Sequence, residues 1–200
     1  TDTRAPYGVM WSVADQGLYT LGANALDTRV GLGWAAPVYI RLLGPNRSVR
    51  GDYDGDLRSD LAVYHPASGN WYIYSLTGGV LAYARNWGWN ATTPVPGDYD
   101  GDGLADFGAY YPAAGTWYLL LSRSHVVRQH AWGWSEAQPV LGDYDGDNIA
   151  DLAVFHPASG NWYIKTMLEE VVAYSLNWGF AGVVPVPGDY DNDRISDPFQ

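Results

Sequence analysis

GDYDGDLRSD, at residues 51–60, places four aspartates within ten positions, and closely similar sequences recur along the 200-residue chain. We call the four segments acidic strings 1 to 4; they are residues 51–60, 97–106 (GDYDGDGLAD), 142–151 (GDYDGDNIAD) and 188–197 (GDYDNDRISD). The first aspartate of each string is position 1, and these are Asp52, Asp98, Asp143 and Asp189, at intervals of 46, 45 and 46 residues. A period of this length indicates a repeat architecture.

The negative charge of the chain is concentrated in these strings. The formal charge is −11, and sixteen of the 22 acidic residues lie in the strings, four in each. The remaining six acidic residues face eleven Lys and Arg, which gives the rest of the chain a charge of +5. The acidity therefore requires a local explanation, and its sign disfavours nucleic acid as a partner.

Other sequence features keep the phase of the strings. NWGW (86–89), AWGW (131–134) and NWGF (177–180) recur, and so does a Trp-Tyr pair whose tryptophans, Trp71, Trp117 and Trp162, are expected in the core. Each repeat contains four short segments rich in β-branched and aromatic residues, separated by Gly, Pro, Asn and Asp. Four strands in about 45 residues are typical of one blade of a β-propeller. The alternative, an open β-solenoid, usually has much shorter turns.

The sequence predicts an all-β fold in one domain, residues 1–200. The chain begins within a second strand (8–11) and ends after a first strand (186–190), which is the strand that the first blade lacks. We therefore expect a four-bladed β-propeller closed by pairing of the C-terminal strand into the N-terminal blade, which leaves no exposed sheet edge. Half of an eight-bladed dimeric ring is the alternative. The expected repeats are approximately residues 1–50 with the closing strand 184–200, then 51–96, 97–141 and 142–187.

Carboxylates occupy positions 1, 3, 5 and 9 of every string, and they would repel one another unless a cation neutralised them. A hard divalent cation held by oxygens at about 2.3–2.6 Å suits such a loop, and Ca²⁺ tolerates its flexible geometry. Gly at position 4 of the first three strings permits a tight, left-handed backbone. Position 7 varies freely, as expected if only its carbonyl oxygen reaches the metal.

An EF-hand is excluded, because position 12 is never Glu and no flanking helices are expected. The expected ligands are Asp52, Asp54, Asp56, Arg58, Asp60; Asp98, Asp100, Asp102, Leu104, Asp106; Asp143, Asp145, Asp147, Ile149, Asp151; and Asp189, Asp191, Asp193, Ile195, Asp197.

The segment GDYDGDGLADFGAYYP (97–112) resembles the Asp-rich Ca²⁺ loop of FG-GAP/VCBS repeats, best known from the β-propeller of integrin α subunits. The resemblance covers essentially the whole chain, with NWGW and the following PVPG in place of the family's Phe-Gly and Gly-Ala-Pro elements. It implies one Ca²⁺ per loop, about four in all, between the first and second strands of each blade. Positions 1, 3, 5 and 9 would then ligate through carboxylates and position 7 through its carbonyl. Integrins have more repeats than this chain, so their ligand recognition is not carried over.

The expected metal sites bear on where the protein works. Weak extracellular Ca²⁺ sites have a Kd of roughly 10⁻⁴–10⁻³ M, which favours an extracellular or periplasmic location over the cytoplasm. The chain has no cysteine, so disulfides are excluded, and the bound ions would stabilise the fold in their place. No apolar run approaches the length of a membrane span, so no membrane insertion is expected. We expect a secreted protein whose signal peptide is already absent.

The end of the repeats opposite the strings is a candidate ligand face. Trp34 and Gly51 are 17 residues apart, whereas the equivalent Trp89 and Gly97 are eight apart. The extra residues fall within AAPVYIRLLGPNR (35–47), and loops that depart from a repeat are where function concentrates. Aromatic side chains at this end suit sugar rings or a protein partner. The candidates are Trp34, Arg41, Arg47, His65, Trp89, Tyr111, Trp134 and His156.

No catalytic constellation is evident, because a general acid–base pair would have to come from Glu136, Glu169, Glu170 or the expected metal ligands. We expect a secreted, calcium-stabilised β-propeller that serves as a binding or adhesion module for glycan or protein ligands, as a monomer or homodimer. The alternatives are a polysaccharide-active enzyme or its accessory domain, and a purely structural module of a larger surface protein.

Overall fold

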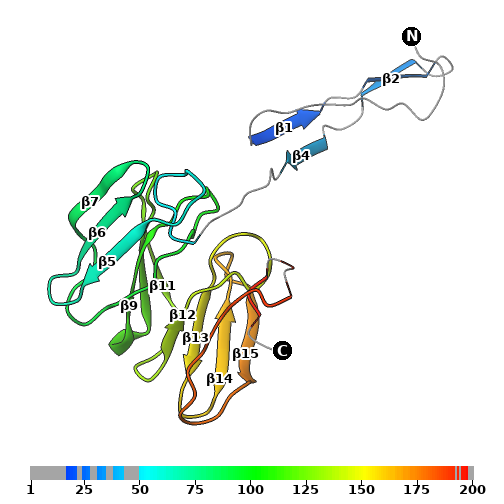
Figure 1. Cartoon of the computed structure of the whole chain (residues 1–200). Helices are drawn as coiled ribbons and strands as arrows, with labels where there is room; N and C mark the ends of the chain where they lie inside the picture. The colour runs from blue at the N-terminus through cyan, green and yellow to red at the C-terminus, as the bar shows by residue number, and fades with distance from the viewer. Residues whose placement is uncertain are drawn as a thin grey trace. The chain divides into compact units, whose positions relative to one another are not determined.

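The computed structural model describes residues 17–21, 24–27, 31–34, 38–42, 50–191, 193 and 195–197. The chain divides into two compact units, Thr1–Asn46 and Arg47–Gln200 (Figure 1). The described residues form antiparallel β-sheets and no α-helix, which confirms the all-β prediction. The one described helical segment is a short 3-10 helix, η1 (Pro112–Ala114). No helix in the described part is long and apolar enough to cross a membrane.

The first unit contains two strand pairs. β1 (Gly17–Leu21) pairs with β4 (Val38–Leu42), and β2 (Asn24–Asp27) pairs with β3 (Gly31–Trp34), both antiparallel. β4 lies within the 35–47 insertion, whose Val-Tyr-Ile run has high β-propensity. The segment that departs from the repeat therefore contributes a strand. The second strand expected at 8–11 lies outside the described residues.

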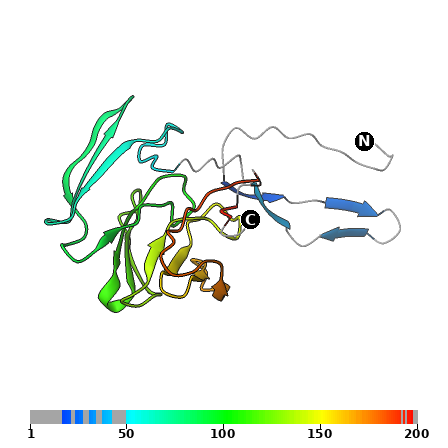
Figure 2. The same ribbon diagram turned by 60° about the horizontal axis from the view of Figure 1, so that its bottom comes forward.

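The second unit contains three antiparallel sheets, which follow one another in chain order (Figures 1 and 2). The first sheet holds three strands and the other two hold four each. Within each sheet, strands adjacent in sequence are neighbours, as expected of repeats built from hairpins. The strands are β5 (Leu61–His65), β6 (Asn70–Ser75), β7 (Gly79–Asn86); β8 (Thr93–Pro94), β9 (Phe107–Tyr111), β10 (Thr116–Leu120), β11 (Val127–Ala131); and β12 (Gln138–Val140), β13 (Leu152–His156), β14 (Asn161–Lys165), β15 (Val171–Asn177).

The three sheets share one register, in which the repeated tryptophan faces an aromatic residue of the preceding strand. The cross-strand pairs are Tyr64 with Trp71, Tyr110 with Trp117, and Phe155 with Trp162. The hairpin between these strands ends at a glycine with positive φ, such as Gly115 at 60°. A Cβ on Gly115 would lie 2.0 Å from the carbonyl oxygen of Gly133. The hairpin and the WGW segment therefore approach each other closely at two glycines.

The core lies between successive sheets, where one face of each sheet covers the opposite face of the next. Trp71 and Ile73 of β6 pack with Phe107 and Leu120 of the second sheet. Trp117 and Leu119 of β10 pack in the same way with Leu152 and Val154 of β13; these contacts alternate along the strands as the pleat requires. Trp71, Trp117 and Trp162 are all buried, as predicted.

One face of the first sheet (β5, β6 and β7) is exposed. No sheet in the described part of the second unit packs against this face. Leu61 of β5 is 60% exposed, whereas Leu152, at the same place in the third sheet, is fully buried. Val63 and Val154 differ in the same way. The sequence places apolar residues on this face in every repeat, so the face has the composition of a covered surface.

Candidate metal centres

Each acidic string forms a loop closed by a backbone hydrogen bond. The N–H of position 9 donates to the carbonyl of the glycine that precedes position 1, at 2.7 to 2.8 Å in all four strings. Position 4 is left-handed at Gly55, Gly101 and Gly146, as predicted. Position 6 is also left-handed, at Leu57, Gly103 and Asn148, which the sequence analysis missed. The signal was the Gly and Asn at this position, the residues that adopt this conformation most readily.

The loops bring together three of the four carboxylates that were predicted as ligands. In each string, oxygens from positions 1, 3 and 9 lie within 4.8 Å of one another. The groups are Asp52, Asp54 and Asp60; Asp98, Asp100 and Asp106; Asp143, Asp145 and Asp151; and Asp189, Asp191 and Asp197. This separation allows one cation to contact all three oxygens.

Backbone N–H groups hold all three of these carboxylates in place, and the position 3 carboxylate accepts the N–H of position 5 at 3.1 to 3.3 Å in every string. The position 9 carboxylate accepts the N–H of position 2, as in Tyr99 to Asp106 at 2.9 Å, and the other three strings repeat this bond at 2.7 to 2.8 Å. The position 1 carboxylate of strings 1 to 3 accepts the N–H of position 4, as in Gly101 to Asp98 at 2.7 Å, and also the N–H of position 6. The loop's own hydrogen bonds thus orient these ligands toward one another, while the repulsion between their charges is uncompensated without a cation.

Position 5 is not part of these groups. Its carboxylate accepts the N–H of position 7, at 2.8 to 2.9 Å in all four strings. Asp56 also accepts a hydrogen bond from the Thr77 hydroxyl, and Asp102 forms an ion pair with Arg123 at 2.9 Å. Position 5 therefore braces the loop, and its role as a metal ligand stays a prediction.

Burial and the proximity of other carboxylates raise pKa values in the clusters of strings 2 and 3. Burial raises the pKa of Asp106 and of Asp151 to about 7, and neighbouring carboxylates add to the rise, while backbone donors oppose it. Burial likewise raises the pKa of Asp98 to about 6. A buried carboxylate cluster is costly when ionised and uncompensated, so it favours either a proton or a cation.

The donor set fits a hard cation. Each cluster offers carboxylate oxygens only, with no imidazole or thiolate, and such sets select Ca²⁺, Mg²⁺ or Mn²⁺ over zinc or copper. The residues present therefore match the kind of metal that the sequence predicts.

Backbone hydrogen bonds also join successive strings to one another. The N–H of position 8 donates to the position 1 carbonyl of the string before it; the pairs are Ala105 to Asp52 (2.6 Å), Ala150 to Asp98 (2.6 Å) and Ser196 to Asp143 (2.5 Å). String 4 also contacts the residue that precedes string 1, because Arg50 Nη2 donates to Ser196 Oγ at 3.2 Å. The four strings therefore gather at one end of the unit.

The side chain at position 7 packs on the preceding string. A Cβ placed on Gly101 would lie 3.1 Å from Cγ1 of Ile149, and Gly55 with Leu104, and Gly146 with Ile195, repeat the contact. Position 7 was interpreted as freely variable, but in strings 2 to 4 this contact explains why it is aliphatic. Arg58 of string 1 is the exception.

The candidate ligand face consists of aromatic contacts at the sheet junctions. Trp89 contacts Tyr111 with ring centroids 5.3 Å apart, and Trp134 contacts His156 at 5.6 Å. His65 ends β5, where its Nδ1 lies 2.8 Å from Ser68 Oγ. The structure thus brings together Trp89 with Tyr111 and Trp134 with His156. The side chains of Trp34, Arg41 and Arg47 lie outside the described ones.

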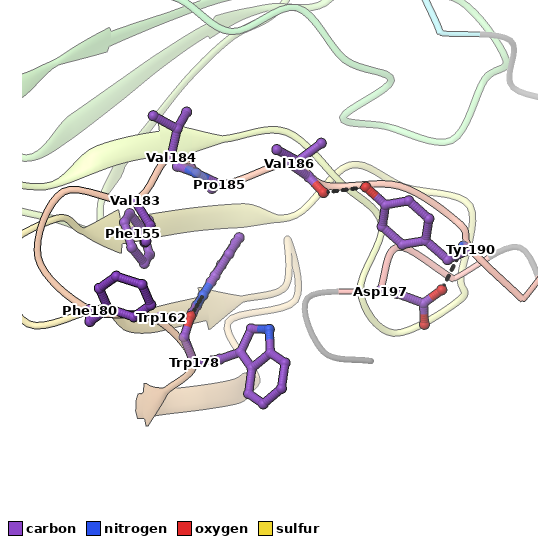
Figure 3. A pocket seen from close by; sticks show the side chains of 11 residues that line it. Phe155, Trp162, Trp178, Phe180, Val183, Val184, Pro185, Val186, Tyr190 and Asp197 are labelled. Atoms are coloured by element: carbon purple, nitrogen blue, oxygen red, sulfur yellow. Dashed lines mark hydrogen bonds between the residues drawn. The ribbon is translucent and has the colours of Figure 1, made fainter.

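An apolar cleft, which the sequence analysis missed, lies beyond the last sheet (Figure 3). It has a volume of about 520 Å³. Tyr190, in its lining, is 59% exposed, whereas the equivalent Tyr99 is fully buried between sheets. The cleft is lined by Phe155, Trp162, Trp178, Gly179, Phe180, Val183, Val184, Pro185, Val186, Tyr190 and Asp197.

Glu169, one of the carboxylates considered for catalysis, is engaged in a charged cluster. It bonds to Lys165 Nζ at 2.5 Å and to His130 Nδ1 at 3.0 Å, and these partners lower its pKa. His130 lies on β11 and Lys165 on β14, so the cluster links the second sheet to the third. A carboxylate whose pKa is lowered by such partners is a poor general acid.

Comparison of the chain with protein-family models, with curated proteins and with solved structures found no match in any of the three.

Proposed function

We propose that each acidic string binds one Ca²⁺ and that the protein is a calcium-stabilised repeat module. The observation that carries this proposal is the approach of three carboxylates to within 4.8 Å in all four strings. Buried positions such as Asp106 make these clusters costly without a counter-ion. Ca²⁺ is preferred to Mg²⁺ because a loop with several carboxylates and carbonyls suits a higher coordination number.

We propose further that the repeats close as four blades, with residues 1–50 completing the first blade and the 184–200 segment pairing into it. The hydrogen bond from Arg50 to Ser196 supports closure, because it links the residue that precedes string 1 to string 4. The exposed Leu61 face and the Tyr190 cleft also support it, since both have the composition of covered junctions. A dimeric ring of eight blades would instead cover these surfaces with a second copy, and light scattering at defined concentration distinguishes the two.

The module is proposed to act outside the cytoplasm, in binding or adhesion, with glycan or protein ligands at the aromatic junctions. Trp89 is 38% exposed beside Tyr111, so part of its ring is open to solvent. Exposed aromatic rings suit the apolar face of a sugar or a protein hot spot. A glycan array with and without Ca²⁺, repeated with Trp89→Ala, tests this role; no bound glycan and no dependence on Trp89 would argue for a purely structural module.

Calorimetric titration of metal-free protein tests the metal sites. We expect four Ca²⁺ per chain and much weaker binding of Mg²⁺. Asp100→Asn, which removes one converging carboxylate, should reduce the count by one, whereas the remote Glu136→Gln should leave it unchanged. An absence of Ca²⁺ binding at millimolar concentration would refute the proposal.

A further inference from the structure

We propose that cation binding at one acidic string is energetically coupled to binding at the strings beside it, in the order 1-2-3-4. This inference rests on the proposed function, because coupling requires that the strings bind cations. It concerns a different property, namely that the four sites do not load independently.

The first link is made by the main chain of position 1. The carboxylate of Asp98 belongs to the cluster of string 2, and the carbonyl of the same residue accepts the N–H of Ala150 in string 3 at 2.6 Å. Ala150 is followed directly by Asp151, a member of the string 3 cluster. One residue of string 2 therefore orients the main chain that carries a ligand of string 3.

The second link is made by packing. Ile149 of string 3 lies against Gly101 of string 2, at a distance that leaves no room for a Cβ without a shift. The N–H of Gly101 donates to Asp98 of its own cluster, and the N–H of Ile149 donates to its brace, Asp147. Movement of either loop therefore displaces the backbone of the other.

These links predict positive coupling. Each loop must hold repelling carboxylates together in a backbone with left-handed residues, so a bound cation orders it. Once one loop is ordered, its neighbour has less disorder to lose on binding, and the effect is reciprocal. String 3 has backbone links to strings 2 and 4, so the loss of its site should affect those two strings more than string 1.

Individual sites can be followed by the position 4 amides in an NMR titration of the full chain with CaCl₂. The N–H groups of Gly55, Gly101 and Gly146 donate to the position 1 carboxylates at 2.6 to 2.7 Å, so each amide reports on its own string. Asp145→Asn removes one ligand from string 3 and preserves its shape. We expect the midpoint at Gly101 to rise about fivefold or more, within the usual range of coupling. The midpoint at Gly55 should change less. The charge-matched control is Glu136→Gln, which should change neither midpoint.

A second variant breaks the link without removing a carboxylate. Ile149→Ala deletes the side chain that packs on Gly101, and we expect the midpoints of strings 2 and 3 to become independent of each other. If Asp145→Asn fails to fold, Ile149→Ala alone tests the coupling between strings 2 and 3. The wild-type amide spectrum provides the reference for folding. Ca²⁺-dependent shifts whose midpoints at Gly101 are the same in the wild type and both variants would overturn the coupling alone. The absence of any Ca²⁺-dependent shift in the wild type would instead overturn the proposed function.

Discussion

Arg50 donates a 3.2 Å hydrogen bond to the hydroxyl oxygen of Ser196, across 146 positions of the sequence. Arg50 directly precedes string 1, and Ser196 is position 8 of string 4. Strings 1 to 4 are already joined in a row by backbone hydrogen bonds. In an open array of repeats the two ends of such a row lie farthest apart, so this contact indicates that the row of loops curves back on itself.

Removal of either partner of this bond should destabilise the second unit. We expect Arg50→Ala to lower the free energy of unfolding by about 0.5–1.5 kcal/mol. Ser196→Ala should cost more, because Ser196 Oγ also accepts the N–H of Asp143 at 3.2 Å. The double variant should cost less than the sum of the two, because the same bond is lost in each. Urea denaturation at fixed Ca²⁺ measures all three.

Arg123→Ala, which breaks an exposed ion pair with Asp102, is the control and should cost under about 0.5 kcal/mol. Strict additivity of the first two substitutions would show that the bond contributes nothing.

Leu61 and Leu152 offer a direct test of ring closure, since they occupy the same position in different sheets and differ in exposure. Leu152→Ala should cost about 2–5 kcal/mol, because it opens a cavity in the core. If residues 1–50 complete the first blade, Leu61 is covered as well, and Leu61→Ala should cost at least about 2 kcal/mol. Leu168, on an exposed turn, provides the control for a leucine without a core role. A cost for Leu61→Ala close to that of Leu168→Ala would contradict closure.

The sequence was sufficient to predict the strands of the second unit, because each repeat presents the same local signals. Trp117 and its counterparts follow a hairpin glycine and face an aromatic partner, so burial and register are set within one repeat. The converging carboxylates at positions 1, 3 and 9 were also predictable, since their spacing and the left-handed Gly at position 4 lie within ten residues.

Features that depend on neighbouring elements were not predictable. Asp102 and Asp106 are the same residue type in one string, and only the fold decides that one braces the loop while the other joins the cluster. Tyr190 is exposed in the cleft, whereas Tyr99, at the same place in its string, is buried between two sheets, although the two strings have nearly the same sequence. The pairing of β1 with β4 likewise depends on an insertion that has no counterpart in the other repeats.

Removal of Ca²⁺ should lower the melting temperature. A site with a Kd of roughly 10⁻⁴–10⁻³ M contributes about 0.4–1.4 kcal/mol at about 1 mM Ca²⁺, so four independent sites contribute ~2–6 kcal/mol. Positive coupling between strings would sharpen the dependence on concentration. Thermal denaturation in excess EGTA and then in excess Ca²⁺ measures the effect. Addition of Mg²⁺ at the same concentration should restore little of the loss, because Mg²⁺ requires a smaller octahedral site. An unchanged melting temperature in EGTA would contradict a stabilising role for the ions.

The stability of the metal-free protein should fall as the pH rises from 5 to 8. The pKa values of Asp106 and Asp151 are raised to about 7 in the folded state, from 3.8 when unperturbed, mainly by burial. The folded state therefore binds more protons than the unfolded state over this range, so the free energy of unfolding decreases with increasing pH and levels off above pH 7. Saturating Ca²⁺ should weaken or reverse the slope, because the cation takes the place of the protons, and Ca²⁺ affinity should decline below pH 7 by the same competition. Urea denaturation at four pH values, with and without Ca²⁺, measures both effects.

Asp106→Asn combined with Asp151→Asn should flatten the dependence of metal-free stability on pH. A metal-free stability that instead rises with pH would mean that these carboxylates are ionised in the folded protein and compensated by groups other than a cation.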